Sequence, residues 1–356
     1  MKKPVVGAVL AAMLVRLAVL AGAGDALASW VRELVVDERL VTTALSLELG
    51  GAPEAETERL LSAEAEAETG AAEEEAPSVV LVAAPRAEPE EAESRGEAAP
   101  EPAVETVATT LSGASSVHNR TSISVDIDAL AAEGVSDSFR LTAGQPQILI
   151  IHTHSSEAYT QDAYDRYEAS DPYRTEDKRY SVIRVGDVLA EQFEAAGLTV
   201  IHDRELYDYP SYTGSYSRSG AAVEKYLAEY PSIKIVIDLH RDAIGSGDVV
   251  YKTQAALDGR TSAQVMLLVG TGENGLYHPN WRENLKLALY MQNAADARYP
   301  TLTRPIELVR ERYNQHLSNG SVLIEVGSTG NTLDEALLAA ELFGGTAGPA
   351  LAALIA

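Results

Sequence analysis

The stretch that decides the fold is residues 148–154, ILIIHTH, in which four apolar residues run into two histidines separated by a threonine. A short apolar run followed by polar residues is typical of a strand buried on both faces. Residues 180–197, YSVIRVGDVLAEQFEAAG, carry apolar side chains at helical spacing, and Gly197 is a stop signal. A buried strand followed by an amphipathic helix indicates an α/β sheet.

The alternation of strands and helices continues along the chain. Strands are expected over 198–206, 233–243, 248–256 and 262–271, helices over 219–231 and 281–300, and a strand, a turn and a helix over 321–343. Thr332 and Glu335 have the spacing of a capping box at the start of the last helix. We therefore predict an α/β three-layer sandwich with a mostly parallel central sheet. In such sheets the ligand crevice lies beyond the carboxyl ends of the strands.

Ionisable side chains follow three of the predicted strands where each strand ends. They are His152, His154 and Glu157 after the first, His240, Arg241 and Asp242 after another, and Glu325 within the last. The chain has no cysteine, so disulfides, thiol nucleophiles and thiolate metal sites are excluded, and a metal would need histidines and carboxylates. A catalytic zinc takes about three such ligands and leaves one position for water. The pattern predicts a zinc site at this edge of the sheet.

We assign His154, Glu157 and His240 as the metal ligands and Glu325 as the general base for the water that the metal activates. A carboxylate within the apolar run VLIEVG costs several kcal/mol to bury without a partner, so a functional role is favoured for Glu325 over a salt bridge. Imidazole and carboxylate ligands also suit divalent ions other than zinc.

Two positions in this ligand set have alternatives. We expect one of the two histidines to bind metal, and His152 is the alternative to His154. Asp177, just before the first long helix, is the alternative to Glu157.

Charge is distributed unevenly. The formal net charge is −25, and residues 51–106 contain 16 Glu and three Arg among alanines and prolines. This segment lacks apolar periodicity, so we predict a disordered acidic linker. The sequence pI of about 4.6 argues against general nucleic-acid binding, because phosphate neutralisation requires Lys and Arg.

The N-terminus is typical of an exported protein. Lys2 and Lys3 precede an apolar run over 4–23 that only Arg16 interrupts, which predicts a signal anchor or a signal peptide. By the positive-inside rule the rest of the chain lies outside the cytoplasm, held by one N-terminal span or secreted if the segment is cleaved. The expected organisation is an anchor or signal over 1–24, a short membrane-proximal segment over 25–50, the linker over 51–118, a lead-in segment over 119–142 and a catalytic domain over 143–356.

A glycine pattern at Gly270, Gly272 and Gly275 formally matches a dinucleotide-binding fingerprint. That fingerprint requires a helix that begins within the glycines, so that its N-terminus meets the pyrophosphate. Here LYHPN intervenes and Pro279 precedes the helix. We therefore predict no nucleotide binding.

Several segments in order resemble the stage II sporulation protein P family. They are ILIIHTHSSEAY (148–159), YSVIRVGDVLAEQ (180–192), DLHRDA (238–243), HPNWRENLKLAL (278–289) and RYNQHLSNGSVLIEVGSTGNTLDEA (312–336). The resemblance covers roughly residues 143–340, and that family is similar to the zinc-dependent N-acetylmuramoyl-L-alanine amidases. It implies that His240 is the second histidine ligand and Glu325 the catalytic glutamate. For the other ligands, the family's HTHxxE motif favours Glu157 and alignment to the amidases favours Asp177.

The resemblance also implies a function and partners. It implies an amidase, with endopeptidase activity as well, that removes stem peptides from septal peptidoglycan during engulfment. It further implies a membrane anchor and stage II sporulation proteins D and M as partners. Arg241, Asn331 or a backbone N–H are the candidates for stabilising the oxyanion. The alternatives are a zinc peptidase of another specificity and a non-catalytic exported scaffold that binds the wall.

Overall fold

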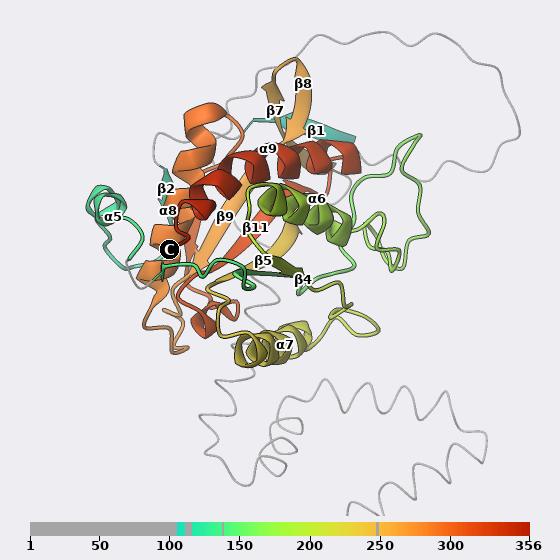
Figure 1. Cartoon of the computed structure of the whole chain (residues 1–356). Helices are drawn as coiled ribbons and strands as arrows, with labels where there is room; N and C mark the ends of the chain where they lie inside the picture. The colour runs from blue at the N-terminus through green and yellow to red at the C-terminus, as the bar shows by residue number, and fades with distance from the viewer. Residues whose placement is uncertain (1–104, 111–115, 137–138, 247–248) are drawn as a thin grey trace, which may run out of the picture. The chain divides into compact units, whose positions relative to one another are not determined.

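The centre of the computed structural model, which describes residues 105–110, 116–136, 139–246 and 249–356, is a seven-stranded β-sheet (Figure 1). The strand order is β2-β10-β9-β11-β5-β3-β4. The strands are β2 (Val117–Asn119), β3 (Ile148–Ile151), β4 (Val200–His202), β5 (Ile235–Asp242), β9 (Val265–Gly270), β10 (Ile306–Val309) and β11 (Ser321–Ser328).

The sheet is mixed: most of its neighbouring pairs run parallel, as expected, and one pair is antiparallel. Strands β9 and β11 are antiparallel neighbours, whereas the other neighbouring pairs in this sheet run parallel. A parallel neighbour requires a long crossover connection, usually a helix. The chain instead reaches β9 through the hairpin of β7 (Val249–Leu257) and β8 (Arg260–Ala263), and this reversal sets the direction of β9.

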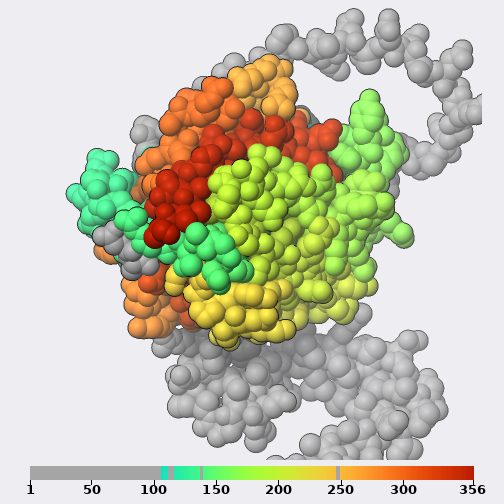
Figure 2. Space-filling view, viewed as in Figure 1, coloured from blue at the N-terminus to red at the C-terminus, as the bar shows by residue number. Residues whose placement is uncertain are grey.

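Helices cover both faces of the sheet, as the sequence predicts for an α/β fold. Figures 1 and 2 show α9, in red, lying beside α6 across one face. That face carries the larger apolar core, which also includes α8, and α7 packs on the opposite face through Val223 against Leu149, Ile151 and Val236. The helices are α5 (Ile127–Glu133), α6 (Val182–Ala195), α7 (Ser215–Glu229), α8 (Trp281–Arg298) and α9 (Leu333–Ala352), with a short 3₁₀ helix η2 (Gln315–Leu317).

The alternation of side chains along β5 separates apolar from polar residues. Ile235, Ile237 and Leu239 belong to the core beneath α6 and α9. Because successive side chains point to opposite faces, Asp238 and His240 lie on the face that carries α7. The strand that appears uninterrupted in the sequence therefore supplies the core with one set of residues and the opposite face with the other.

Local signals explain where the helices begin. The Thr332 hydroxyl accepts a hydrogen bond from Glu335 N, and the reciprocal half of the predicted capping box is also present at the start of α9. Helix α7 begins at Ser215, four residues before the predicted start at 219, directly after Gly214 with φ of 81°. Glycine adopts this left-handed backbone at little cost, so the turn leads straight into the helix.

A smaller sheet formed by β1 (Glu105–Thr109), β7 and β6 (Gly245–Ser246), with β8 paired to β7, lies beside the main one. Strands β1 and β2 both include residues predicted to lie in the linker over 51–118, so regular structure begins earlier than residue 119. The predicted segments 1–24 and 25–50, and the linker as far as residue 104, lie outside the described residues. Within the described part of the chain, no helix is long and apolar enough to cross a membrane.

Candidate functional site

Two of the predicted site residues come from neighbouring strands. Glu325 on β11 is the direct partner of His240 on parallel β5, and Leu323 is likewise the partner of Asp238. Residues paired in this way present their side chains on the same face. The sheet register therefore places Glu325 beside His240, on the face that carries α7.

His154 reaches the same place from the turn that follows β3. Its ring centroid lies 5.2 Å from that of His240, and the two planes are nearly perpendicular at 81°. Both imidazoles are buried. The two histidines, 86 positions apart in the sequence, are therefore neighbours, because β3 and β5 are adjacent parallel strands that end at one edge.

Glu157 completes this group. Its Oε2 atom lies 3.4 Å from His240 Nδ1, and Arg241 N donates a hydrogen bond to the same oxygen at 3.2 Å. Arg174 Nη2 is 3.7 Å from Oε1. Burial on its own would raise the pKa of Glu157, but the contact with His240 and the charge of Arg241 outweigh it and hold the pKa below the ordinary value. The carboxyl is therefore ionised, as a metal ligand must be.

His240 lies between two carboxylates. Its Nδ1 faces Glu157, and its Nε2 is 2.9 Å from Asp238 Oδ1. Burial opposes protonation of the ring, but the charges and contacts of Asp238 and Glu157 prevail and raise the pKa of His240 well above its usual value. Asp238 is not among the residues predicted from the sequence to form the site. The signal was its position two residues before His240 on a buried strand, which places both on one face.

His154 has a different set of neighbours. Tyr212 stacks on its ring with centroids 4.4 Å apart, and the Tyr212 hydroxyl is 3.0 Å from His154 Nε2. Ser215 Oγ is 3.5 Å from Nδ1. Burial lowers the pKa of His154 to about 3, so its ring is neutral. Arg174 also lies over the Tyr212 ring, 4.8 Å from its centroid, so the tyrosine contacts both a guanidinium and an imidazole.

Glu325 has the electrostatics of a proton-transfer group. Burial and then the charge of Asp242 raise its pKa to about 8, against the opposing charges of His240 and Arg304. Its Oε2 atom is buried and accepts no hydrogen bond from the part of the chain that the structure describes. Arg304, itself buried, donates to Asp242 at 2.6 Å. A carboxyl with a free oxygen and a pKa in this range can accept a proton and return it.

The alternative ligands lie elsewhere. His152 Nδ1 is 2.8 Å from Leu239 O and its Nε2 is 2.8 Å from His202 Nε2, so both of its nitrogens are in use on the α6 side of the sheet. Asp177 is partly exposed and forms an ion pair with Arg179 at 2.5 Å.

The spacing of Glu157 and His240 fits a metal ion, whereas the position of His154 fits in part. Two ligands at about 2.1 Å from a tetrahedral ion lie roughly 3.4 Å apart, and the Glu157 Oε2 to His240 Nδ1 distance is 3.4 Å. His154 is adjacent, but its nitrogens are turned towards Tyr212 and Ser215. Among the described residues, no set of three His, Asp or Glu side chains is arranged to hold a metal ion.

Comparison with known sequences places the chain in a family. A family model described as Stage II sporulation protein P (SpoIIP) matches residues 43–345. The chain belongs to this family. Over 211 residues it is 27% identical to Stage II sporulation protein P of Bacillus subtilis (strain 168), an alignment that takes in 56% of this chain and 50% of the relative. The chain thus spans about half the length of the curated SpoIIP relative that it matches.

Solved structures with partial likeness include three N-acetylmuramoyl-L-alanine amidases. The enzyme from Clostridium difficile 630 is 14% identical with a TM-score of 0.35, and the match covers 59% of this chain and 96% of that one. Ami1 from Mycobacterium smegmatis is 12% identical with a TM-score of 0.34, covering 60% and 98%. AmiC2 of Nostoc punctiforme is 15% identical with a TM-score of 0.32, covering 60% and 96%.

The two predicted oxyanion residues of this SpoIIP chain are engaged in local structure. The Arg241 guanidinium donates to Ala158 O at 2.6 Å and to Tyr173 O at 3.1 Å. The Asn331 amide accepts from Ser328 N at 2.9 Å and donates to Glu335 at 2.8 Å. Both side chains therefore tie segments together at the edge of the site.

Proposed function

We propose that this chain is a zinc-dependent peptidoglycan hydrolase of sporulation, an N-acetylmuramoyl-L-alanine amidase that removes stem peptides from glycan strands. Membership of the SpoIIP family supports the substrate and the biological setting. The observation that carries the chemistry is that Glu325 is paired in register with His240, whose Nδ1 lies 3.4 Å from Glu157. A base, an imidazole and an ionised carboxylate are thus grouped at one edge of the sheet.

His154, Glu157 and His240 would hold the ion. When bound there, zinc polarises the scissile carbonyl and lowers the pKa of water towards neutrality. Burial keeps His154 neutral, and Glu157 stays ionised beside Arg241, so these two residues are already in the protonation states of ligands. His154 would exchange its contact with Tyr212 for the ion, and its place in the turn after β3 leaves the ring beside His240.

Glu325 would act as general base and then as general acid. Its free Oε2 accepts a proton from the attacking water, and the same carboxyl returns the proton to the nitrogen of the leaving peptide. Asp242 and burial raise the affinity of this carboxyl for the proton, which suits it for both steps. Since β11 and β5 are hydrogen-bonded neighbours, the base is held at a fixed distance from the His240 ligand.

The remaining expectations from the sequence belong to the same proposal. The chain would be anchored by the segment over 1–24, with its catalytic part outside the cytoplasm, and would act with stage II sporulation proteins D and M on septal wall. The two basic residues Lys2 and Lys3 before the apolar run support this orientation. Fractionation of cells expressing the chain tests it, because release of the protein into the soluble fraction would contradict anchoring.

Product analysis on purified sacculi tests the reaction. Full-length protein is loaded with zinc, its metal content is measured by elemental analysis, and the digest is examined by mass spectrometry. An amidase gives free stem peptides and intact glycan chains, with about one zinc per chain. Cut cross-links with stem peptides still attached would instead identify a peptidase. Equal digestion by the wild type and by His240→Ala would exclude this site as the source of activity.

A further inference from the structure

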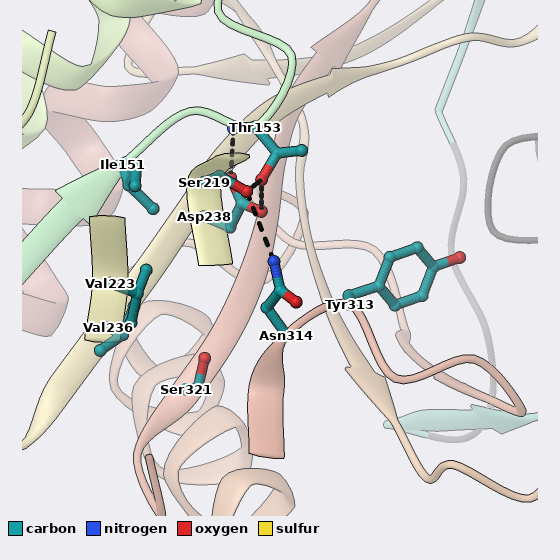
Figure 3. Close-up of a pocket in the computed structure, with 9 residues that line it drawn as sticks. All are labelled: Ile151, Thr153, Ser219, Val223, Val236, Asp238, Tyr313, Asn314 and Ser321. Carbon is teal, nitrogen blue, oxygen red and sulfur yellow. Dashed lines mark hydrogen bonds between the residues drawn. The ribbon is translucent and has the colours of Figure 1, made fainter. Parts of the chain in front are cut away.

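A buried aspartate lies behind the candidate site. Figure 3 shows Asp238 at the centre of a small pocket, with Thr153, Ser219 and Asn314 around it. Asp238 Oδ1 accepts a hydrogen bond from Thr153 N at 2.8 Å, and Oδ2 accepts one from the Thr153 hydroxyl at 2.6 Å. The Thr153 hydroxyl in turn lies 2.7 Å from Ser219 Oγ on α7. The carboxylate is therefore held in one orientation by two bonds from a single residue.

The same carboxylate reaches His240. Oδ1 lies 2.9 Å from His240 Nε2, on the side of the ring opposite to Glu157. Among the described residues Nε2 has no partner with regular hydrogen-bond geometry, so the contact is electrostatic. Two acceptor atoms this close would repel each other, so the position of the carboxylate favours a proton on Nε2. A neutral ring with its proton on Nε2 has its lone pair on Nδ1, which faces Glu157 at 3.4 Å. With a metal ion between Nδ1 and Glu157, Asp238 would keep the proton of the neutral ring on Nε2 and leave Nδ1 to the metal.

Asp238 also links the two histidine-bearing segments. Thr153 is the residue directly before His154, and its backbone N–H is bound by the same Oδ1 that faces His240. The turn after β3 and the end of β5 are therefore connected through one oxygen atom. Displacement of the aspartate would release the His154 turn and the His240 ring together.

We infer that Asp238 is a positioning residue that holds His240 with its Nε2 protonated and its Nδ1 directed to the metal, and that it fixes the His154 turn to that ring. This inference rests on the proposed function, since it takes His240 as a zinc ligand. Residues that orient ligating histidines in this way typically change metal affinity by about 10–100-fold when they are removed.

The experiment compares zinc affinity in full-length variants by competition with a chromophoric chelator. Asp238→Ala removes the acceptor, and we expect zinc to bind about 10–100-fold more weakly. Asp238→Asn is milder, because Thr153 N–H keeps the amide oxygen in the Oδ1 position; the charge and the hydrogen bond that Oδ2 accepts from the Thr153 hydroxyl are lost. The matched control is Asp203→Ala, another buried carboxylate, which binds Glu205 N and the Tyr207 hydroxyl instead of a site histidine. We expect that variant to bind zinc as the wild type does.

A spectroscopic measurement separates positioning from general loss of structure. Long-range ¹H–¹⁵N correlation spectra of histidine-labelled, zinc-loaded protein report which nitrogen carries the proton. We expect a protonated Nε2 and a metal-bound Nδ1 for His240 in the wild type and in Asp238→Asn, with a mixture of ring states in Asp238→Ala. Circular dichroism confirms that the variants are folded before comparison.

The possible outcomes distinguish failure of the role inferred for Asp238 from failure of the proposed zinc site. One outcome is that the wild type binds zinc, that His240→Ala weakens zinc binding and that Asp238→Ala does not. Asp238 would then have no positioning role, whereas the metal site would stand. Equal weakening in Asp238→Ala and Asp203→Ala would also overturn the inference, since the effect would be general. If the wild type binds no zinc, or His240→Ala binds it unchanged, the metal site is wrong and the role of Asp238 falls with it.

Discussion

Two pairs of imidazoles lie on opposite faces of β3 and β5, and their surroundings differ. His152 pairs with His202 on the α6 side, where a backbone carbonyl and the neighbouring ring take up both nitrogens of His152. His154 pairs with His240 on the α7 side, where two carboxylates flank His240. Gly186 of α6 packs so closely that a Cβ there would lie 2.6 Å from His202 Nε2.

The difference shows how one motif can serve two purposes. A continuing strand would place both imidazoles of HTH on one face. Strand β3 ends at Ile151, and the turn that follows lets His152 point into the α6 side while His154 reaches the edge beside His240. Because Leu239 O can only accept, His152 Nδ1 donates to it, and the neutral ring then accepts from His202. Both nitrogens of His152 therefore have hydrogen-bond partners within the protein. The pair on the other face has anionic neighbours and an adjacent base, which is the arrangement that a cation and a substrate would require.

The largest expected effect comes from the base beside the His154–His240 pair. Glu325→Gln keeps the shape of the side chain but cannot accept a proton, so release of stem peptides should fall by about 10²–10⁴-fold. Zinc content should stay at the wild-type level. The measurement is the rate of peptide release from purified sacculi, with Glu307→Gln on β10 as the matched control. Undiminished release by Glu325→Gln would remove the base from the proposal.

A substitution of each histidine in the HTH motif tests which face holds the metal. His154→Asn should weaken zinc binding on the order of a hundredfold, because the binding energy of a structural zinc is shared among about four ligands. His152→Asn can still donate to Leu239 O and should leave zinc affinity within a few-fold of the wild type. Chelator competition measures both. The reverse ranking would make His152 the ligand and the two faces would exchange roles.

The His152–His202 pair on the α6 side should be sensitive to added side-chain volume at Gly186. Gly186→Ala places a methyl group 2.6 Å from His202 Nε2 and 2.7 Å from His152 Nε2, and we expect a loss of about 1–3 kcal/mol in the free energy of unfolding. Gly345→Ala on α9 is the control, because the nearest atom to its Cβ would be 3.7 Å away. That change should be neutral or slightly stabilising. Urea unfolding measures both, and equal effects would show that the contact with the histidines is not tight.

Acid should lower the free energy of unfolding of the metal-free protein through the His152–His202 pair. Burial and then His202 lower the pKa of His152 from 6.5 to about 3, so the folded chain keeps this ring neutral while the unfolded chain binds a proton. The contribution of His152 to the free energy of unfolding is therefore fully present above pH 6.5. It is lost as the pH drops towards 3, by at most about 1.4 kcal/mol per pH unit. His152→Asn should show a shallower fall in urea unfolding with a chelator present. An unchanged slope would mean that His152 is not buried as a neutral ring.

Several features were predictable from local patterns. The α/β class follows from apolar runs alternating with amphipathic helices, and it is confirmed by the sheet and its covering helices. The capping box at Thr332 is confirmed, and the resemblance to the SpoIIP family is confirmed by the family match. The assignment of His154, Glu157, His240 and Glu325 to metal and base remains a prediction, although the structure brings these four together.

By itself, the sequence determined which segments would be buried and which residue types would stand at their ends, because period and polarity are properties of neighbouring residues along the chain. Only the tertiary structure decided that β9 runs against β11, that His152 belongs with His202, and that Tyr212 contacts His154. These are contacts between residues far apart in sequence. They depend on strand order, register and the course of the connections, which no local pattern encodes.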